Sequence, residues 1–332
     1  MLFRSYHLQK MAQINVSWDG IPKTLLEEQC AAVLNSRISH QLTWLLGLNI
    51  FLSITAVLGN TLILVALGQE ISLHAPSKLL LRCLSTTDLL VGLLSEPMYA
   101  AYEMSLLNGS LETCRLTFVI SFIAGYILSG VSLFTSTAIS LDKLLALLMG
   151  LRYKLVVTLK RARFTVTIIW IVGVVCSILY LWNDQIPLTY AYVCTLICLV
   201  ISVFSYTTIF VTLRHRQTQV QDLINQHANP RSPMNIAFNR RAVSSALWLQ
   251  ITLVCCYLPH GIMSALLRHS EESTAASFNR HYTGTLVFAN STLNPFIYCL
   301  TIREVRKFVR ETISKLLNIQ PQRVHNPSAT DP

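Results

Sequence analysis

The stretch Asn290-Ser-Thr-Leu-Asn-Pro-Phe-Ile-Tyr298 places several polar side chains and a proline inside an otherwise apolar segment. Pro295 has no backbone N–H, and its ring clashes with the carbonyl one turn back, so we expect the helix to bend and leave a carbonyl unpaired. We expect Asn290, Ser291 and Asn294 to satisfy such freed groups, directly or through water. The alternative interpretation is a kinked membrane helix with no further role.

The composition indicates a membrane protein. The 332-residue chain is 52% hydrophobic and only 13% charged, which is too apolar for a soluble domain of this size. A membrane-spanning helix needs about 20 mostly apolar residues, and seven stretches qualify, at 41–67, 78–101, 115–148, 164–182, 188–213, 242–267 and 282–301. They are continuous apolar runs, unlike the alternating segments of a membrane barrel. The predicted fold is therefore an all-α bundle of seven transmembrane helices.

The positions of lysine and arginine predict the orientation, because cations near span ends are retained in the cytoplasm. They gather after the first, third and fifth spans and in the tail, whereas 102–114 and 183–187 contain none. We therefore expect a plasma-membrane protein with an extracellular segment at 1–40 and a membrane domain at 41–301. The cations lack interleaved aromatic residues, so no nucleic-acid partner is expected. Residues 1–40 have no apolar core, which predicts that there is no cleavable signal peptide.

The region after the last span predicts a short amphipathic helix at 302–317, followed by a cytoplasmic tail at 318–332. Val305, Phe308, Val309 and Leu316 recur at helical spacing, with arginine and lysine around them. This pattern is typical of a helix that lies on anionic membrane lipid. A solvated basic helix is the alternative.

Two features of the extracellular side are open to modification. Asn15-Val-Ser17 matches the acceptor pattern for N-glycosylation. Of the nine cysteines, Cys30 and Cys114 lie outside the apolar core of the spans, and they could form a disulfide in an oxidising compartment.

A set of polar residues lies at mid-membrane depth. Asp88 is the clearest acid, and a carboxylate there costs about 2.5 to 3.5 kcal/mol on insertion scales, so it needs partners or a cation. The residues at comparable depth are Asn60, Ser132, Asn290, Ser291 and Asn294. A water-filled packing network and a proton or ion path through a transporter are both compatible with this set.

Six motifs, each on its own span, carry a resemblance to a known family. They are Gly59-Asn60, Leu84-Ser-Thr-Thr-Asp88, Trp170, Tyr206, Pro259 and Asn294-Pro-Phe-Ile-Tyr298. In this order they are similar to the motifs of rhodopsin-like (class A) G-protein-coupled receptors. The short loop at 183–187, the lack of a proline in span 5 and the run from Leu151 to Arg161 are most similar to the melanocortin, cannabinoid, lysophospholipid and adenosine receptor cluster.

The resemblance implies a receptor that transmits the signal of a small-molecule, lipid or peptide ligand to heterotrimeric G proteins. It also implies a sodium ion as an allosteric ligand, held by Asp88, Ser132, Asn290, Ser291 and Asn294, and no other cofactor. These side chains offer the oxygen ligands that a hard cation prefers. No glycine-rich phosphate loop, zinc-spaced set or nucleophile elbow occurs, so an enzyme is not expected.

The resemblance assigns switching and G-protein coupling to Asp142, Lys143, Leu151, Tyr206, Pro259, Pro295 and Tyr298. Lys143 stands where the family usually has arginine, and it lacks the planar fork of donors. The start of span 6 offers Asn239, Arg240 and Arg241 but no acid. Because the interhelical ion pair of many resting receptors is then missing, we expect high basal activity.

The residues expected to line an outward-facing ligand cavity are Tyr126, Ser129, Tyr257, His260, Ser264, Gly284 and Phe288. They predict an apolar pocket with a few hydrogen-bonding groups. His260 is either a ligand contact or a histidine satisfied within the bundle. By resemblance, Gly125 disfavours an amine ligand and Phe288 disfavours retinal. A melanocortin-type site is disfavoured by Met98, Phe118 and Phe122. We assign no role to Glu96 and Glu103.

A transporter or ion-conducting protein that uses the Asp88 set is the alternative function. Such a protein normally shows internal repeats or paired broken helices, and this sequence shows neither.

Overall fold

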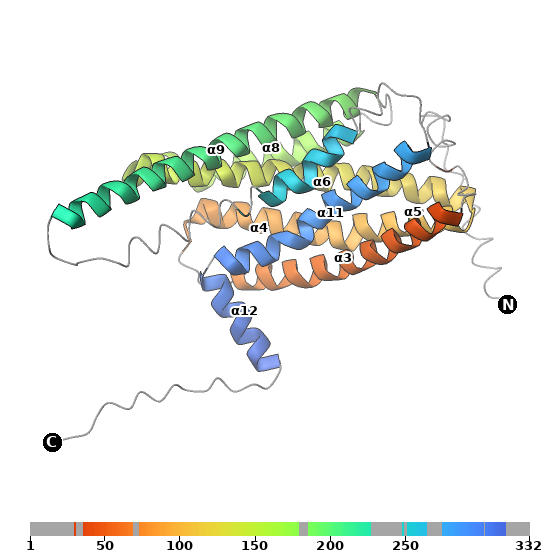
Figure 1. Ribbon diagram of the computed structural model, residues 1–332, viewed down its shortest axis with the longest axis horizontal. Coiled ribbons are helices and arrows are strands. Elements are labelled where there is room, and N and C mark those ends of the chain that lie inside the picture. Colours follow the sequence, from red (N-terminus) through yellow and green to blue (C-terminus); the bar gives the residue numbers. More distant parts are fainter. Residues whose placement is uncertain are drawn as a thin grey trace, which may run out of the picture.

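The computed structural model describes residues 30, 36–68, 73–178, 185–226, 248, 251–263, 274–301 and 303–316. Asn15, Ser264 and the stretch from Asn239 to Arg241 lie outside these residues, as does the side chain of Leu151. All regular structure in the described part of the chain is helical. The predicted all-α bundle is confirmed, and its helices lie roughly parallel or antiparallel along one long axis (Figure 1).

The membrane helices follow the seven predicted apolar stretches. In chain order they are α3 (Ser36–Gly68), the rod made of α4 (Ala75–Leu90), η1 (Val91–Ser95) and α5 (Glu96–Leu107), α6 (Leu111–Met149), α8 (Leu159–Ile178), α9 (Gln185–Gln226), a helix at Ile251–Met263, and α11 (Thr274–Thr301). A 3-10 turn (Gly150–Arg152) and α7 (Tyr153–Val156) join α6 to α8. By length and composition, four helices in the described part can each cross a membrane alone, and α11 passes that test together with the start of α12 (Arg303–Leu316).

Helix α9 corrects two sequence-based boundaries. It begins at Gln185, within the loop expected at 183–187, and continues to Gln226, beyond the end of the apolar stretch expected at 188–213. Residues 214–226 contain neither glycine nor proline, so nothing in their backbone chemistry ends the helix when the apolar stretch ends. The extension projects beyond the bundle (Figure 1).

The second span is not the single α-helix that its apolar run predicts. A π-helical turn at Val91–Ser95 separates α4 from α5, and Pro97 follows directly. Proline cannot donate to the carbonyl four residues earlier, which explains a local change in the hydrogen-bonding pattern here. After this turn, Glu96 and Glu103 are both fully buried.

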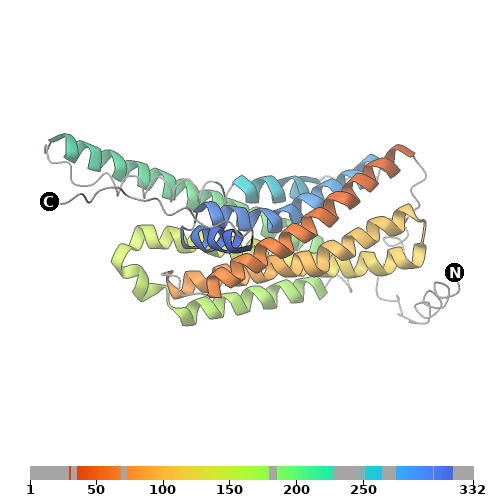
Figure 2. The ribbon, with the colours of Figure 1, turned by 90° about the horizontal axis from the view of Figure 1, so that it is seen from below.

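Close packing between α3, the second span and α11 depends on two glycines. A Cβ at Gly92 would lie 3.0 Å from the Ser53 carbonyl oxygen, and one at Gly59 would lie 2.9 Å from Cγ of Pro295. Ser53 Oγ also donates to the Gly92 carbonyl over 2.8 Å. Figure 2 shows α3 crossing the bundle obliquely. Because both approaches leave no room for a side chain, these contacts fix how the three helices sit.

The helix after the last span forms as predicted. Val305 of α12 is fully buried against Tyr298 and Ile63, while Arg306 caps α11 by donating to the carbonyls of Cys299 and Leu300 over 2.9 and 2.6 Å. The chain bends by 99° between α11 and α12, so α12 leaves the bundle at a steep angle (Figure 1).

Candidate functional site

Asp88 joins three membrane helices at the centre of the bundle. Its Oδ1 accepts hydrogen bonds from Ser132 of α6 over 3.0 Å and Ser291 of α11 over 2.9 Å, and its Oδ2 accepts from Asn294 Nδ2 over 2.7 Å. All four side chains are almost completely buried. Four of the five residues predicted to form one polar site therefore meet directly.

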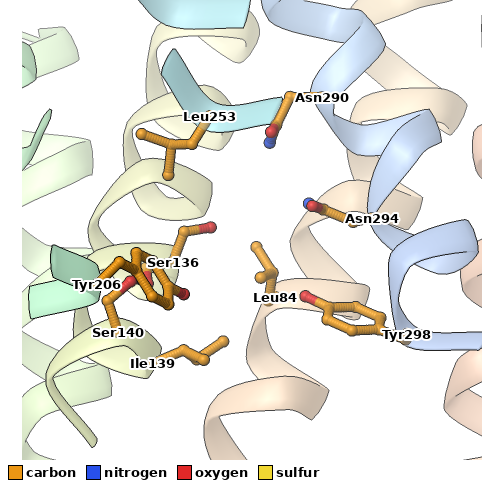
Figure 3. A pocket seen from close by; sticks show the side chains of 9 residues that line it. All are labelled: Leu84, Ser136, Ile139, Ser140, Tyr206, Leu253, Asn290, Asn294 and Tyr298. Atoms are coloured by element: carbon orange, nitrogen blue, oxygen red, sulfur yellow. The ribbon is translucent and has the colours of Figure 1, made fainter. Parts of the chain in front are cut away.

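Asn290, the fifth predicted member, faces a neighbouring cavity. Its Nδ2 is buried without a protein partner, as is the hydroxyl of Tyr298. Both residues line a cavity with Ser136, Ser140 and Tyr206, and Figure 3 shows their side chains converging on it from α6, α9 and α11. A polar cavity with unpaired donors is the kind of place in which proteins hold ordered water.

The carbonyl freed by Pro295 has a different partner from those predicted. That carbonyl belongs to Ser291, and Asn60 Nδ2 of α3 donates to it over 3.0 Å. Asn60 also donates to the Ala56 carbonyl over 2.9 Å. The sequence-based expectation named Asn290, Ser291 and Asn294, but Ser291 and Asn294 turn to Asp88 because its carboxylate is the stronger acceptor.

The end of the bundle at which α6 joins α7 holds a second carboxylate site. Asp142 Oδ1 accepts from the Tyr153 hydroxyl over 2.6 Å, and Oδ2 accepts from Ser77 over 2.7 Å. Burial, and then the bond to Asp142, raise the pKa of Tyr153 from 10.0 to about 12, so the phenol remains a donor at neutral pH. The sequence placed Asp142 among the switch residues but missed Tyr153 and Ser77, because neither spacing nor hydropathy marks them.

The residues predicted to bind a ligand each contact a different neighbour in the bundle. Tyr257 donates to the Ser129 carbonyl over 3.2 Å, His260 contacts Thr283 over 3.4 Å, and Tyr126 packs on Phe122 with ring centroids 4.3 Å apart. Pro259, the remaining switch residue of this region, lies on the same short helix as Tyr257 and His260. These residues face the bundle from three helices.

Tyr99 organises the rest of this region and was not predicted. Its ring meets Phe288 edge-on with centroids 5.3 Å apart, and a Cβ at Gly284 would lie 3.3 Å from its hydroxyl. Gly125 leaves room for Phe288 across the bundle. The sequence signal for Tyr99 was only an aromatic residue near the outer end of span 2.

The end of the bundle opposite Asp142, at the start of α6, carries a covalent link and a buried ionisable cluster. Cys30 and Cys114 form a disulfide that closes a separation of 84 residues. Beside it, Glu103 of α5 is fully buried between Asn49 of α3 and His281 of α11. Sequence analysis assigned no role to Glu103 because its partners are distant along the chain.

Comparison with known proteins gives the family. The family model for the 7 transmembrane receptor (rhodopsin family) matches residues 59–186 and 176–298. The chain is also similar to the adenosine receptor A2a of Homo sapiens, with 24% identity over 299 residues, covering 79% of this chain and 70% of that receptor. The matched residues include Asp88 and its partners, Asp142 and the proline of the last span. The chain therefore belongs to the rhodopsin family of seven-transmembrane receptors.

Proposed function

We propose that this receptor carries the signal of an extracellular ligand to heterotrimeric G proteins at the inner face of the plasma membrane. The observation that carries the proposal is the set of hydrogen bonds that ties Asp88 to α6 and α11. Because one buried carboxylate holds residues from three helices, a ligand that favours another helix arrangement must change these bonds.

Sodium is the proposed allosteric ion at Asp88. The carboxylate accepts three hydrogen bonds from neutral groups, Ser132, Ser291 and Asn294, so its negative charge has no countercharge among these partners. Hydroxyl, amide and carboxylate oxygens are the ligands that a hard cation prefers. When bound there, sodium would supply the positive charge, while the surrounding side chains would orient the carboxylate and limit access by water.

The cytoplasmic contacts support a coupling role for the Asp142 site. Tyr153 lies four residues after Met149, where α6 ends, and its bond to Asp142 joins the connecting segment to α6. Ser77 extends the contact to α4. Lys143 takes part in neither of the two hydrogen bonds to Asp142. The residues at the start of span 6, Asn239, Arg240 and Arg241, include no acid that could form an interhelical ion pair. We propose that the lack of an interhelical ion pair gives the receptor substantial basal activity.

Orientation and ligand complete the proposal. The distribution of lysine and arginine supports an extracellular N-terminus, which would expose Asn15 to glycosylation, and the buried apolar face of α12 supports a position at the inner membrane surface. The residues predicted to line a ligand cavity support a largely apolar ligand with a few polar groups; those in the described part of the chain are Tyr126, Ser129, Tyr257, His260, Gly284 and Phe288. Adenosine, named by the relative, is a first compound to test.

Nucleotide exchange tests this function directly. Purified receptor in lipid nanodiscs is mixed with a panel of heterotrimeric G proteins, and GDP release is compared with that of empty nanodiscs. We expect faster release for at least one heterotrimer without added ligand. By resemblance to the family, the apolar side chain of Leu151 would insert into the G-protein α subunit, so Leu151→Asp should reduce this release. Leu155→Asp, at an exposed position in the same segment, serves as the matched control.

Ion or solute flux measured on the same preparation separates the receptor from a transporter, a function that the family assignment does not favour. Flux without nucleotide exchange from any heterotrimer would contradict the proposal.

A further inference from the structure

A buried carboxylate lies at the outer end of the bundle, away from the Asp88 site. Glu103 of α5 has no exposed surface, and its Oε2 accepts from Asn49 Nδ2 of α3 over 2.9 Å. Its other oxygen, Oε1, has no hydrogen-bond partner. Removing a carboxylate from water without pairing its charge is costly, so this oxygen has a strong tendency to take up a donor or a positive charge.

The group that faces the unpaired oxygen is an imidazole from the last span. His281 Nδ1 of α11 lies 3.7 Å from Glu103 Oε1, which is beyond hydrogen-bond distance but within reach of a small side-chain movement. The same nitrogen lies 3.1 Å from the Tyr99 hydroxyl. Tyr102 also stacks on the imidazole of His281. The two rings are nearly parallel, with their centroids 5.6 Å apart.

These contacts hold His281 at one place relative to α5. Tyr99 and Tyr102, both on α5, fix the plane and position of the ring, and Tyr102 in turn packs on Phe118 of α6. His281 keeps 11% of its side-chain surface exposed, whereas Glu103 keeps none. A proton can therefore reach the imidazole from water, but a larger ligand cannot reach the carboxylate without moving these side chains.

This end of the bundle carries other ionisable groups. Glu96 lies on α5 two turns further into the membrane, Glu112 and Arg115 lie on the outer turn of α6, and exposed His40 lies on α3. Glu271, Glu272 and the side chain of Arg280 lie outside the described residues. Within the described ranges, Glu103 is the acid within ion-pair distance of His281.

We propose that protons are a ligand of this receptor and bind at the pair formed by His281 and Glu103. Protonation converts the imidazole from a neutral neighbour into a cation that donates to the unpaired oxygen of the carboxylate. Histidine is the side chain that most commonly changes its charge near physiological pH in proteins. The effect on signalling rests on the proposed receptor function, whereas proton binding at the pair does not.

The direction of the effect follows from linkage. An arrangement in which the cation meets Glu103 binds the proton more tightly than one in which α11 and α5 have separated. Acidification therefore stabilises this arrangement, and the stabilisation is lost as the pH rises and the imidazole becomes neutral. The bond from Asn49 to Glu103 extends the effect to α3, so three helix ends are drawn together in acid.

The pair is connected to the centre of the receptor through Tyr99. Its hydroxyl contacts His281, and its ring packs edge-on against Phe288, two turns further along α11. Ser291, which donates to Asp88, follows Phe288 by less than one turn. Movement of α11 at its outer end is thus passed to the Asp88 site through contacts on a single helix.

Thermal unfolding of the purified full-length receptor at about pH 5.5 and about pH 8 tests proton binding. The variants are His281→Gln, Glu103→Gln and their double mutant, because glutamine retains hydrogen-bonding groups but does not titrate in this range. We expect the difference in melting temperature between wild type and His281→Gln to be larger at the acidic pH by about 3 °C. The coupling between the two positions, taken from the double-mutant cycle, should show the same pH dependence.

Two further variants serve as controls. His40→Gln removes an exposed imidazole from the same end of the molecule and should leave the pH dependence unchanged. Tyr99→Phe removes the second contact of His281 but keeps the titratable pair, so its melting temperature should retain the dependence on pH. A difference between wild type and His281→Gln that is constant with pH, or that shrinks in acid, would overturn the proposal.

Nucleotide exchange measured on the same samples separates this proposal from the receptor function. A pH-dependent coupling of His281 and Glu103 without exchange on any heterotrimer supports the proton site and counts against the signalling role. Exchange with no pH dependence of the coupling supports the signalling role and overturns the proton site.

Discussion

The side chain of Asn60 on α3 occupies the hydrogen-bonding position that Pro295 leaves open, donating from Nδ2 to the carbonyl of Ser291 over 3.0 Å. Asn60 and Ser291 are 231 positions apart in the chain. Because the Ser291 side chain donates to Asp88, a single residue of α11 connects the first span through its backbone and the second through its side chain. The proline therefore creates an acceptor that fixes α3 to α11.

Replacing Asn60 with alanine should destabilise the receptor by about 1 to 3 kcal/mol, because the buried Ser291 carbonyl would lose its donor. Thermal unfolding measures the change. Thr61→Ala is the matched control, since Thr61 is exposed and bonds only within its own helix. Equal melting temperatures for the two variants would show that the freed carbonyl finds another donor.

Gly59→Ala should also lower the stability, by about 1 to 3 kcal/mol, because the added methyl group would meet the ring of Pro295 at 2.9 Å. Gly47→Ala on the same helix adds a methyl group that meets nothing within 4 Å, and it should be neutral or slightly stabilising through helix propensity. Melting temperatures of the two single variants measure the contrast, and a Gly59→Ala protein as stable as wild type would contradict the packing argument.

Sodium should raise the melting temperature of the wild-type receptor relative to the same concentration of potassium, since a ligand of the folded state stabilises it by mass action. Asp88→Asn should abolish this difference, because the amide keeps a similar shape but has no charge. Ser132→Ala should weaken it, and Ser314→Ala in α12, distant from Asp88 in the sequence, should leave it intact. A sodium response that persists in Asp88→Asn would argue against an ion at this site.

Tyr153→Phe should increase basal nucleotide exchange by up to about tenfold, since losing one charge-assisted hydrogen bond of about 1.4 kcal/mol in the resting arrangement shifts a two-state equilibrium by that factor. Ser77→Ala should act in the same direction, because it removes the other donor to Asp142. Exchange is measured at matched receptor concentration, and rates equal to wild type in both variants would assign the Asp142 contacts a purely structural role.

The effect of Tyr153 should not vary with pH between about 6 and 8. Burial raises the pKa of Tyr153 from 10.0 to about 12, so the fold favours the neutral phenol. That stabilisation is fully present below the ordinary pKa and is lost only as the pH rises toward the raised value. A difference in exchange between wild type and Tyr153→Phe that changes across neutral pH would therefore have another origin.

Loss of the disulfide should destabilise the receptor by about 4.5 kcal/mol on the chain-entropy estimate, because the bond closes a long loop. Cys30→Ser, Cys114→Ser and the double variant should be equally destabilised relative to wild type. Peptide mapping without reduction should recover the two cysteines in one linked fragment. Recovery of separate peptides, each with a free thiol, would contradict the pairing.

The class of the protein and its central polar site could be predicted from the sequence. Continuous apolar runs specify membrane helices because hydropathy is a local property, and Asp88 is conspicuous because an acid in such a run is expensive. Their positions in the spans placed Ser132, Ser291 and Asn294 at a depth comparable to that of Asp88, and resemblance to a family assigned them to one ion site with it. In the structure, each of these side chains donates a hydrogen bond to a particular oxygen of the Asp88 carboxylate.

Contacts between distant helices were decided by the tertiary structure alone. Pairs such as Asn60 with Ser291, Tyr153 with Asp142 and His281 with Glu103 depend on the rotation and height of each helix relative to its neighbours. Neither quantity can be read from an apolar run, since all faces of a membrane helix can be hydrophobic. In the second span, the π-turn at Val91–Ser95 also changes which residues beyond it face inward. The sequence by itself therefore determined that there is a membrane bundle with a buried acid, while helix rotation and the π-turn decided which side chains meet.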